Sequence, residues 1–264
     1  MSVGGVETCL EVPAWKLAFD MGSCSRSAVN LSTVLFTHAH IDHMGALATH
    51  AATRELWGLS PARYVLPPSV LPGVQQLLEA WRTLDGAKFD PELVPLAPGD
   101  TLDLGKGRRV TALRTVHRVV SQAYVVSERR KRLRPELVGL PGAEIAAKRG
   151  AGEEIDEVWY TDELAFSGDT RIEGLTEHER IMACRRLILE VTFLDDRVTV
   201  EMARKMGHIH LDELVRDAAL FRNEALLLTH RSARFREAEA QQLLADRLPP
   251  ELAGRVQSFD GQNP

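Results

Sequence analysis

The chain has 264 residues, of which 44% are hydrophobic and 26% are charged. These values are ordinary for a globular protein, so they exclude a chain that is disordered or fibrous throughout. No apolar run approaches the roughly 18 residues that a membrane span needs, and residues 1–9 show no basic region followed by an apolar one. We therefore expect a cytoplasmic protein of one or two domains with no membrane partner.

The cysteine spacing and the net charge bear on two further classes of protein, disulfide-stabilised and nucleic-acid-binding proteins. Three cysteines, Cys9, Cys24 and Cys184, lie far apart and match no paired zinc spacing, which excludes a disulfide framework and favours buried thiols. The 32 Lys and Arg residues against 37 Asp and Glu residues give a net charge of −5. At first sight this balance argues against a nucleic-acid partner, because phosphate binding usually leaves a basic footprint.

Along the chain, short apolar runs alternate with longer amphipathic ones. Neither a fixed-period repeat nor a low-complexity linker divides the sequence, which favours one compact domain. Strands are predicted at 34–36, 64–66, 110–116, 123–126, 164–167, 187–189 and 225–228. Apolar residues at three- and four-residue steps predict helices at 73–83, 196–206, 211–221 and 238–248. Strands interleaved with helices are typical of a layered α/β fold.

Residues 128–156 differ from the rest of the chain. A basic run is followed by Pro135 and then by a Gly- and charge-rich stretch with little strand character. We expect an excursion from the core here, and composition alone leaves open whether it is a solvated surface loop or a binding element.

The densest chemical signal is an HxHxDH motif that directly follows the strand expected at 31–36. It places His38, His40, Asp42 and His43 within six residues. Imidazole and carboxylate are ligands that zinc prefers, and a turn between a strand and a helix can offer them in several directions. The motif therefore predicts a metal site.

Three further candidate ligands each lie just beyond the end of an apolar strand: His117, Asp169 and His230. Sites in layered α/β folds assemble in such loops, so we expect these side chains to join the motif in one pocket. Seven ligands suit two metals that share a water, which becomes the attacking hydroxide near neutral pH. Zinc is the first choice, and Mn²⁺ or Fe²⁺ remains open.

A second pair of residues suits proton transfer. His208 lies between two helical patterns, and Glu190 follows the strand at 187–189. Cleavage of a phosphodiester needs a proton for the leaving oxygen, which a histidine held by a carboxylate can supply. The alternative is that His208 only caps a helix.

These residues resemble the metallo-β-lactamase fold superfamily and, within it, the short, plant-type form of the ribonuclease Z family of tRNA 3′-processing endonucleases. HxHxDH alone indicates the superfamily. The narrower resemblance is carried, in order along the chain, by residues 4–9 (GGVETC), 19–22 (FDMG), 167–170 (SGDT), 190–196 (EVTFLDD), 207–211 (GHIHL) and 228–235 (LTHRSARF).

The resemblance implies an αββα four-layer sandwich, a homodimer, and hydrolysis of a tRNA precursor on the 3′ side of the acceptor stem. By position, it assigns His38, His40 and His117 to one zinc, Asp42, His43 and His230 to the other, and Asp169 to both. Asp42 also counts among the catalytic residues, with His208 and Glu190 as the proton-donor pair.

The resemblance also implies that residues 128–156 form a protruding arm on a single domain 1–264. The arm would bind backbone phosphates of tRNA. We assign this role to basic residues of the arm and of the last motif: Arg129, Arg130, Lys131, Arg132, Arg134, Arg231 and Arg234.

Five positions depart from the family pattern: Arg231 stands in place of Phe, Phe235 in place of Tyr, Ile209-His210 in place of Ser-Thr, and Leu189 in place of His. They put the exact substrate in question more than hydrolysis itself. The alternatives are a small-substrate hydrolase of the superfamily (a thioesterase, lactonase or phosphodiesterase) and a non-catalytic RNA-binding protein.

Overall fold

The computed structural model describes residues 2–258, which form two large β-sheets and one small one. The five-stranded sheet has the order β3 (Leu10–Val12), β4 (Leu17–Phe19), β5 (Thr33–Leu35), β6 (Arg63–Leu66), β7 (Glu92–Pro95). The seven-stranded sheet has the order β15 (Val256–Ser258), β13 (Ala225–Thr229), β12 (Arg186–Glu190), β11 (Asp156–Phe166), β10 (Gln122–Leu133), β9 (Arg108–Arg114), β8 (Thr101–Gly105). The small sheet joins β14 (Arg231–Ser232), β1 (Ser2–Gly4) and β2 (Glu7–Thr8).

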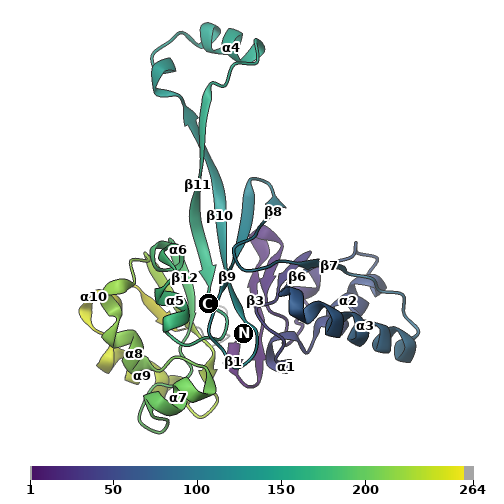
Figure 1. Cartoon of the computed structure of the whole chain (residues 1–264), viewed down its shortest axis with the longest axis vertical. Helices are drawn as coiled ribbons and strands as arrows, with labels where there is room; N and C mark the ends of the chain where they lie inside the picture. The colour runs from purple at the N-terminus through teal and green to yellow at the C-terminus, as the bar shows by residue number, and fades with distance from the viewer. Residues whose placement is uncertain (1, 259–264) are drawn as a thin grey trace.

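Helices cover the outer face of each large sheet (Figure 1). On the five-stranded sheet these are α2 (Leu47–Leu56) and α3 (Leu71–Asp85). On the seven-stranded sheet they are α5 (Glu173–Thr176), α6 (Glu179–Ala183), α8 (Leu211–Arg216), α9 (Glu237–Arg247) and α10 (Pro250–Ala253). The remaining helices are α1 (Ile41–Met44), α4 (Gly142–Gly150) and α7 (Val200–Met206). Within residues 2–258, no helix is long and apolar enough to cross a lipid bilayer.

The strands bury both faces, because successive side chains point to opposite sides of a sheet. Val34 packs toward α2 and α3, whereas Leu35 packs between the two sheets. In β10, Val125 faces the helices of the other outer layer and Tyr124 faces the space between the sheets. The resulting helix, sheet, sheet, helix order confirms the four-layer αββα sandwich.

Two helices are shorter than the sequence predicts. The helix expected at 196–206 begins only at Val200, since the side chain of Thr199 accepts a hydrogen bond from the backbone of Met202 and caps it. The helix expected at 211–221 begins at Leu211, where His210 and Glu213 form a capping box, but it ends at Arg216.

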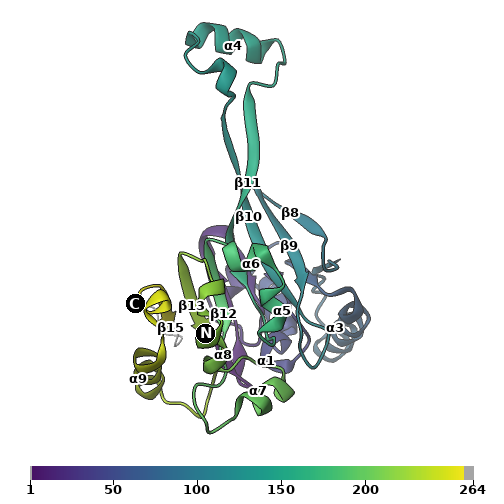
Figure 2. The same cartoon turned by 60° about the vertical axis from the view of Figure 1, so that its left-hand side comes forward.

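The β10–β11 hairpin runs far beyond the core and carries α4 at its tip (Figures 1 and 2). The hairpin beyond the core extends past the expected end at residue 156, so from here on "arm" denotes residues 128–161. The expectation of little strand character in 128–156 was wrong at both ends, because β10 continues to Leu133 and β11 begins at Asp156. Opposite charges across the hairpin stabilise these rungs: Arg132 lies opposite Glu157, and Nε of Arg132 donates to Oε2 of Glu157 at 2.8 Å.

The packing between the sheets predicts a large effect of Leu35→Ala. Leu35 is fully buried there, so its truncation should lower the free energy of unfolding by about 2–5 kcal/mol, measured by urea denaturation. The matched control is Leu84→Ala, because Leu84 is 78% exposed and its truncation should change stability by less than about 0.5 kcal/mol. Equal losses for the two variants would contradict the assigned layer order.

Candidate metal centre and proton-donor pair

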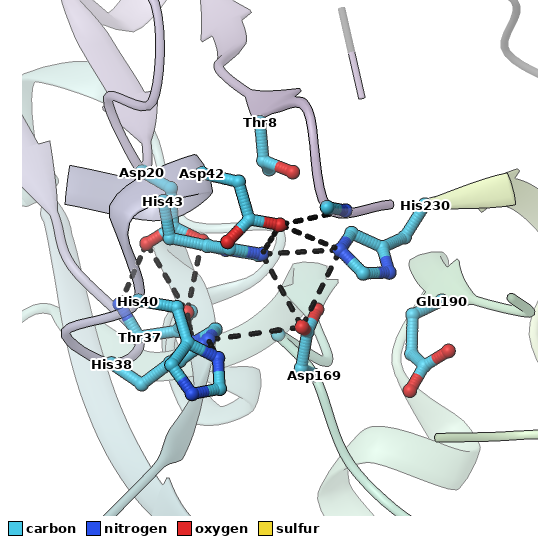
Figure 3. Close-up of polar contacts among 12 residues, drawn as sticks. Thr8, Asp20, Thr37, His38, His40, Asp42, His43, Asp169, Glu190 and His230 are labelled. Carbon is cyan, nitrogen blue, oxygen red and sulfur yellow. Dashed lines mark hydrogen bonds and ion pairs between the residues drawn. The ribbon is translucent and has the colours of Figure 1, made fainter. Parts of the chain in front are cut away.

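The ends of four strands, β5, β9, β11 and β13, deliver the candidate ligands to one place, and a fifth strand, β12, brings Glu190 beside them. In the seven-stranded sheet, β11, β12 and β13 are parallel, and β9 runs in the same direction because β10 is antiparallel to both of its neighbours. Their carboxyl ends therefore share an edge. The loop after β5 and helix α1 bring the HxHxDH residues to this edge, where the side chains converge on Asp169 (Figure 3).

One group of possible ligand atoms joins His38, His40, His117 and Asp169. Nδ1 of His40 lies 3.0 Å from Nε2 of His38 and 3.3 Å from Nε2 of His117. Oδ2 of Asp169 lies 3.7 Å from Nε2 of His38. Three imidazole nitrogens and one carboxylate oxygen thus face a common point.

A second group joins Asp42, His43 and His230. Nε2 of His43 lies 3.2 Å from Nε2 of His230, and Oδ2 of Asp42 lies 3.8 and 3.6 Å from these two atoms. Oδ2 of Asp169 is 3.3 Å from His43 and 3.4 Å from His230, so the same carboxylate oxygen adjoins both groups.

The outward nitrogen of each deeply placed histidine has a hydrogen-bond partner that fixes the ring. Nδ1 of His43 bonds Oδ2 of Asp20 at 2.7 Å, and Nδ1 of His117 donates to the carbonyl of Gly207 at 2.9 Å. Nδ1 of His38 and of His230 bond the hydroxyls of threonines that donate onward to carboxylates, Thr37 to Asp20 and Thr192 to Glu190. Such partners orient metal-binding imidazoles and raise their basicity.

The protonation pattern of the first group fits a cation. A carbonyl can only accept, so the proton of His117 is on Nδ1 and its Nε2 presents a bare lone pair. The hydroxyl of Thr37 gives its proton to Asp20, so it accepts from Nδ1 of His38. Nε2 of His38 therefore also presents a bare lone pair. Burial, reinforced by the nearby charge of His43, lowers the pKa of His38 well below its usual value, so the ring stays neutral. Converging lone pairs repel each other unless a metal ion lies between them.

The second group favours positive charge for a different reason. Burial disfavours a charged His43, but the carboxylates of Asp169 and Asp20 outweigh it and raise the pKa of His43 well above its usual value. Burial likewise opposes the charged form of Asp169, yet His230 and His43 hold its pKa well below the usual range. With Asp42 and Asp169 both ionised, this group suits a divalent cation.

The expected proton-donor pair adjoins the cluster. Nδ1 of His208 lies 3.1 Å from Oε1 of Glu190, and the ring of His208 stacks on that of His230. Glu190 also accepts from the backbones of Thr170 and Ile209 and from the hydroxyl of Thr192. Burial works against a charged His208, but the Glu190 carboxylate outweighs it and raises the pKa of His208 to about 9.

Comparison with known proteins shows the family of this chain. A family model described as the beta-lactamase superfamily domain matches residues 17–231. The chain is 39% identical to tRNase Z TRZ1 of Arabidopsis thaliana, over 97% of this chain and 92% of that protein. The chain belongs to the tRNase Z family. It is also 37% identical to the chloroplastic tRNase Z TRZ2 of the same plant, over 92% of this chain and 69% of that protein.

Solved structures agree with this chain in fold. The short form of human tRNase Z superposes with a TM-score of 0.63 at 17% identity, covering 98% of this chain and 93% of that one. The metallo-beta-lactamase fold protein YhfI of Bacillus subtilis gives 0.64 at 16% identity, covering 98% and 93%. These likenesses concern the backbone architecture alone.

The run of basic residues expected to bind RNA, 129–134, lies away from the metal cluster, whereas Arg231 directly follows the candidate ligand His230. The basic run belongs to the arm, and most of it is paired within the arm. Arg134 pairs with Glu154 at 2.8 Å, Arg132 with Glu157, and Lys131 with Asp156. Arg130 pairs at 2.5 Å with Glu163 at the base of the arm. The arm contains seven Lys and Arg residues and seven Asp and Glu residues, so its basic run is not an unopposed positive surface.

The structure shows where the residues that depart from the family pattern lie. His210, in place of Thr, is fully buried and caps α8. Phe235 is buried beneath the guanidinium of Arg197, whose Cζ lies 4.2 Å from the ring centre. Arg231 lies in β14, paired with β1 beside the ligand His230, and Arg234 follows it on the exposed surface.

Two important residues escaped the sequence reasoning. Asp20 is fully buried with a φ of +57° and binds both Thr37 and His43. Thr192 links Glu190 to His230. Asp20 had a signal in the sequence, since it lies in the stretch 19–22 that carries the resemblance and directly follows an apolar strand, as several candidate ligands do. Thr192 lies in the stretch 190–196 that carries the family resemblance, but its role depends on two side chains that only the fold brings together.

Asp20→Asn tests the role of the hydrogen-bond partners that orient the histidine rings of the cluster. The seven candidate ligands remain, but an amide cannot stabilise His43 as a carboxylate does, so metal affinity should fall about 10- to 100-fold. Competition with a chromophoric chelator would measure it. The matched control is Asp85→Asn at the exposed end of α3, which should bind metal as the parent does. Parental affinity in Asp20→Asn would contradict the role assigned to Asp20.

Proposed function

We propose that this protein is a metal-dependent endoribonuclease that removes 3′ trailers from tRNA precursors and leaves a 3′-hydroxyl on the tRNA. The observation that carries the proposal is the convergence of seven candidate ligand residues beside a Glu190–His208 pair at one edge of the seven-stranded sheet. Relatives that share 37–39% of its residues over more than nine tenths of the chain are named tRNase Z.

The chain's own residues fit two metal ions, for which we propose Zn²⁺, with Mn²⁺ or Fe²⁺ as alternatives. His38, His40 and His117 would hold one ion, Asp42, His43 and His230 the other, and Asp169 both. Bound dications lower the pKa of coordinated water and stabilise negative charge on an attacked phosphate. Asp20, Thr37, Thr192 and the Gly207 carbonyl keep the four rings aimed inward.

We assign the leaving-group proton to His208. Its Nδ1 is held by Glu190, which leaves Nε2 to carry a proton to the 3′ oxygen of the tRNA as the bond breaks. Glu190 keeps three further hydrogen bonds, so its carboxylate stays fixed while the ring donates. Neither residue is needed to open a thioester or a lactone.

We further propose that residues 1–264 act as one domain with the protruding arm, that the protein is a homodimer, and that it works in the cytoplasm. The arm extends far enough from the core to contact a part of a large RNA that lies away from the scissile bond (Figure 1). These proposals rest on the family resemblance and the shape of the hairpin.

One assay separates the proposal from its rivals. The purified protein is incubated with Zn²⁺ or Mn²⁺ and a tRNA precursor bearing a 3′ trailer, and in parallel with a small thioester and a lactone. We expect a single cut at the 3′ side of the acceptor stem. Turnover of a small ester without RNA cleavage would favour a small-substrate hydrolase. Metal content well below two equivalents together with tRNA binding would favour a non-catalytic RNA-binding protein.

His208→Ala tests the proton-donor assignment. Loss of a general acid should lower turnover of the precursor by roughly 10² to 10⁴, while metal content and RNA affinity stay at parental values. Single-turnover cleavage and metal analysis measure these. His178→Gln is the control, since His178 is half-buried and donates to the carbonyl of Arg114, a bond that an amide can keep. Parental cleavage rates in His208→Ala would refute the assignment.

Replacing the five basic residues of the arm, Arg129, Arg130, Lys131, Arg132 and Arg134, by Ala should weaken precursor binding and flatten its dependence on salt. Each free phosphate contact contributes about 0.9 to the slope of log K against log salt. Because four of these residues have acidic partners, the slope should fall by less than five such contacts would give. Unchanged affinity and slope would identify a solvated arm without an RNA contact.

A further inference from the structure

The arm leaves the core at an irregular point of the hairpin. The register of β10 against β11 shifts between Val126 and Ser127: Val126 lies opposite Leu164, whereas Ser127 lies opposite Asp162. Glu163 is therefore the extra residue of a β-bulge. Bulges bend a strand and increase its twist, so this rung sets the direction in which the arm departs.

Support from the neighbouring strand ends at almost the same place. β9 pairs with β10 only as far as Glu128, opposite Arg108. Beyond that rung the arm consists of two strands, and a two-stranded ribbon has little stiffness of its own. The direction of the arm must therefore be fixed at its base.

Three hydrogen-bonded residues, Arg180, Asp162 and Ser127, hold that base, and we call them the brace. Arg180 on α6 donates to both carboxylate oxygens of Asp162, from Nε and from a terminal nitrogen, each at 2.8 Å. The hydroxyl of Ser127 donates to Asp162 at 2.7 Å and accepts from Arg180 at 3.1 Å. Both strands of the bulged rung are thus tied to one guanidinium, in the two-pronged geometry that makes such pairs strong and directional.

The brace connects the arm to the metal centre through a short stretch of chain. Arg180 follows Asp169 by eleven residues, by way of α5. Helix α6 is held to β9 because Nε2 of His178 donates to the carbonyl of Arg114 at 2.7 Å. At the bulge itself, Glu163 links Arg130 of the arm to Arg185, which immediately precedes β12. The base of the arm is therefore tied on both sides to elements that carry the site.

We propose that Arg180, Asp162 and Ser127 fix the angle of the arm and act as positioning residues for substrates large enough to touch both the arm and the metal centre. The inference rests on the proposed function, since it concerns an RNA bound at two places. When two binding elements are joined rigidly at the right separation, the second contact forms at high effective concentration, and a loose joint loses that advantage. A small phosphodiester that occupies only the metal centre gains nothing from the brace.

Arg180→Ala tests the proposal with two substrates. For a tRNA precursor, KM should rise about tenfold with kcat within about twofold of the parent, while kcat/KM for bis(p-nitrophenyl) phosphate stays unchanged. Arg180→Lys retains a single donor toward Asp162 and should give an intermediate KM. The matched control is Arg222→Ala, which removes a guanidinium paired with Glu179 on the same helix but not in contact with the arm; it should behave as the parent.

Small-angle X-ray scattering of the RNA-free variants supplies a readout independent of activity. A parent with a fixed arm should give a sharply bounded distance distribution, and Arg180→Ala should broaden its longest distances. Equal losses with both substrates, or an unchanged KM for the precursor, would overturn the proposal. If the parent itself fails to cut the precursor, the proposed function is wrong, and the scattering comparison with Arg222→Ala alone decides whether the brace fixes the arm.

Discussion

The metal centre depends on one buried carboxylate that is not itself a candidate ligand. Asp20 accepts hydrogen bonds from the backbone and hydroxyl of Thr37 and from the ring of His43, and it is fully shielded from water. Through Thr37 it orients His38 of one ligand group, and directly it orients His43 of the other. A charge in such surroundings is costly unless its hydrogen bonds are satisfied and positive charge lies nearby. The two ligand groups and the metal ions they suit provide both conditions.

A second chain of contacts joins the metal centre to the proton donor. The hydroxyl of Thr192 accepts from His230 and donates to Glu190, which in turn holds His208. Displacement of any one of these groups would therefore disturb both the proposed metal ligand His230 and the proposed proton donor His208. The network also explains why Glu190 can be buried beside the cluster, since every oxygen of its carboxylate is engaged.

In the arm, the charge of the basic run is largely offset by ion pairs with acidic residues across the hairpin. Five basic residues within six positions suggested a phosphate-binding surface. The hairpin places an acidic strand beside them, so a large part of their charge is used to hold the two-stranded arm together, where neighbouring strands offer no support. The arm is therefore a long, nearly neutral projection, and we propose that Asp162 and Arg180 set its direction at the bulge.

The sequence by itself determined the layered α/β class, the strand positions in the core and the seven candidate ligands. These follow from short, continuous apolar runs, which are typical of strands buried on both faces, and from the rule that polar residues after buried strands gather at one edge. Only the tertiary structure decided that Asp20 and Thr192 connect the ligands, that the basic run faces acidic partners, and that Glu163 forms a bulge at the base of the arm. Each of these depends on contacts between residues far apart in the chain, whose geometry is set by strand register and packing and leaves no periodic trace in the sequence.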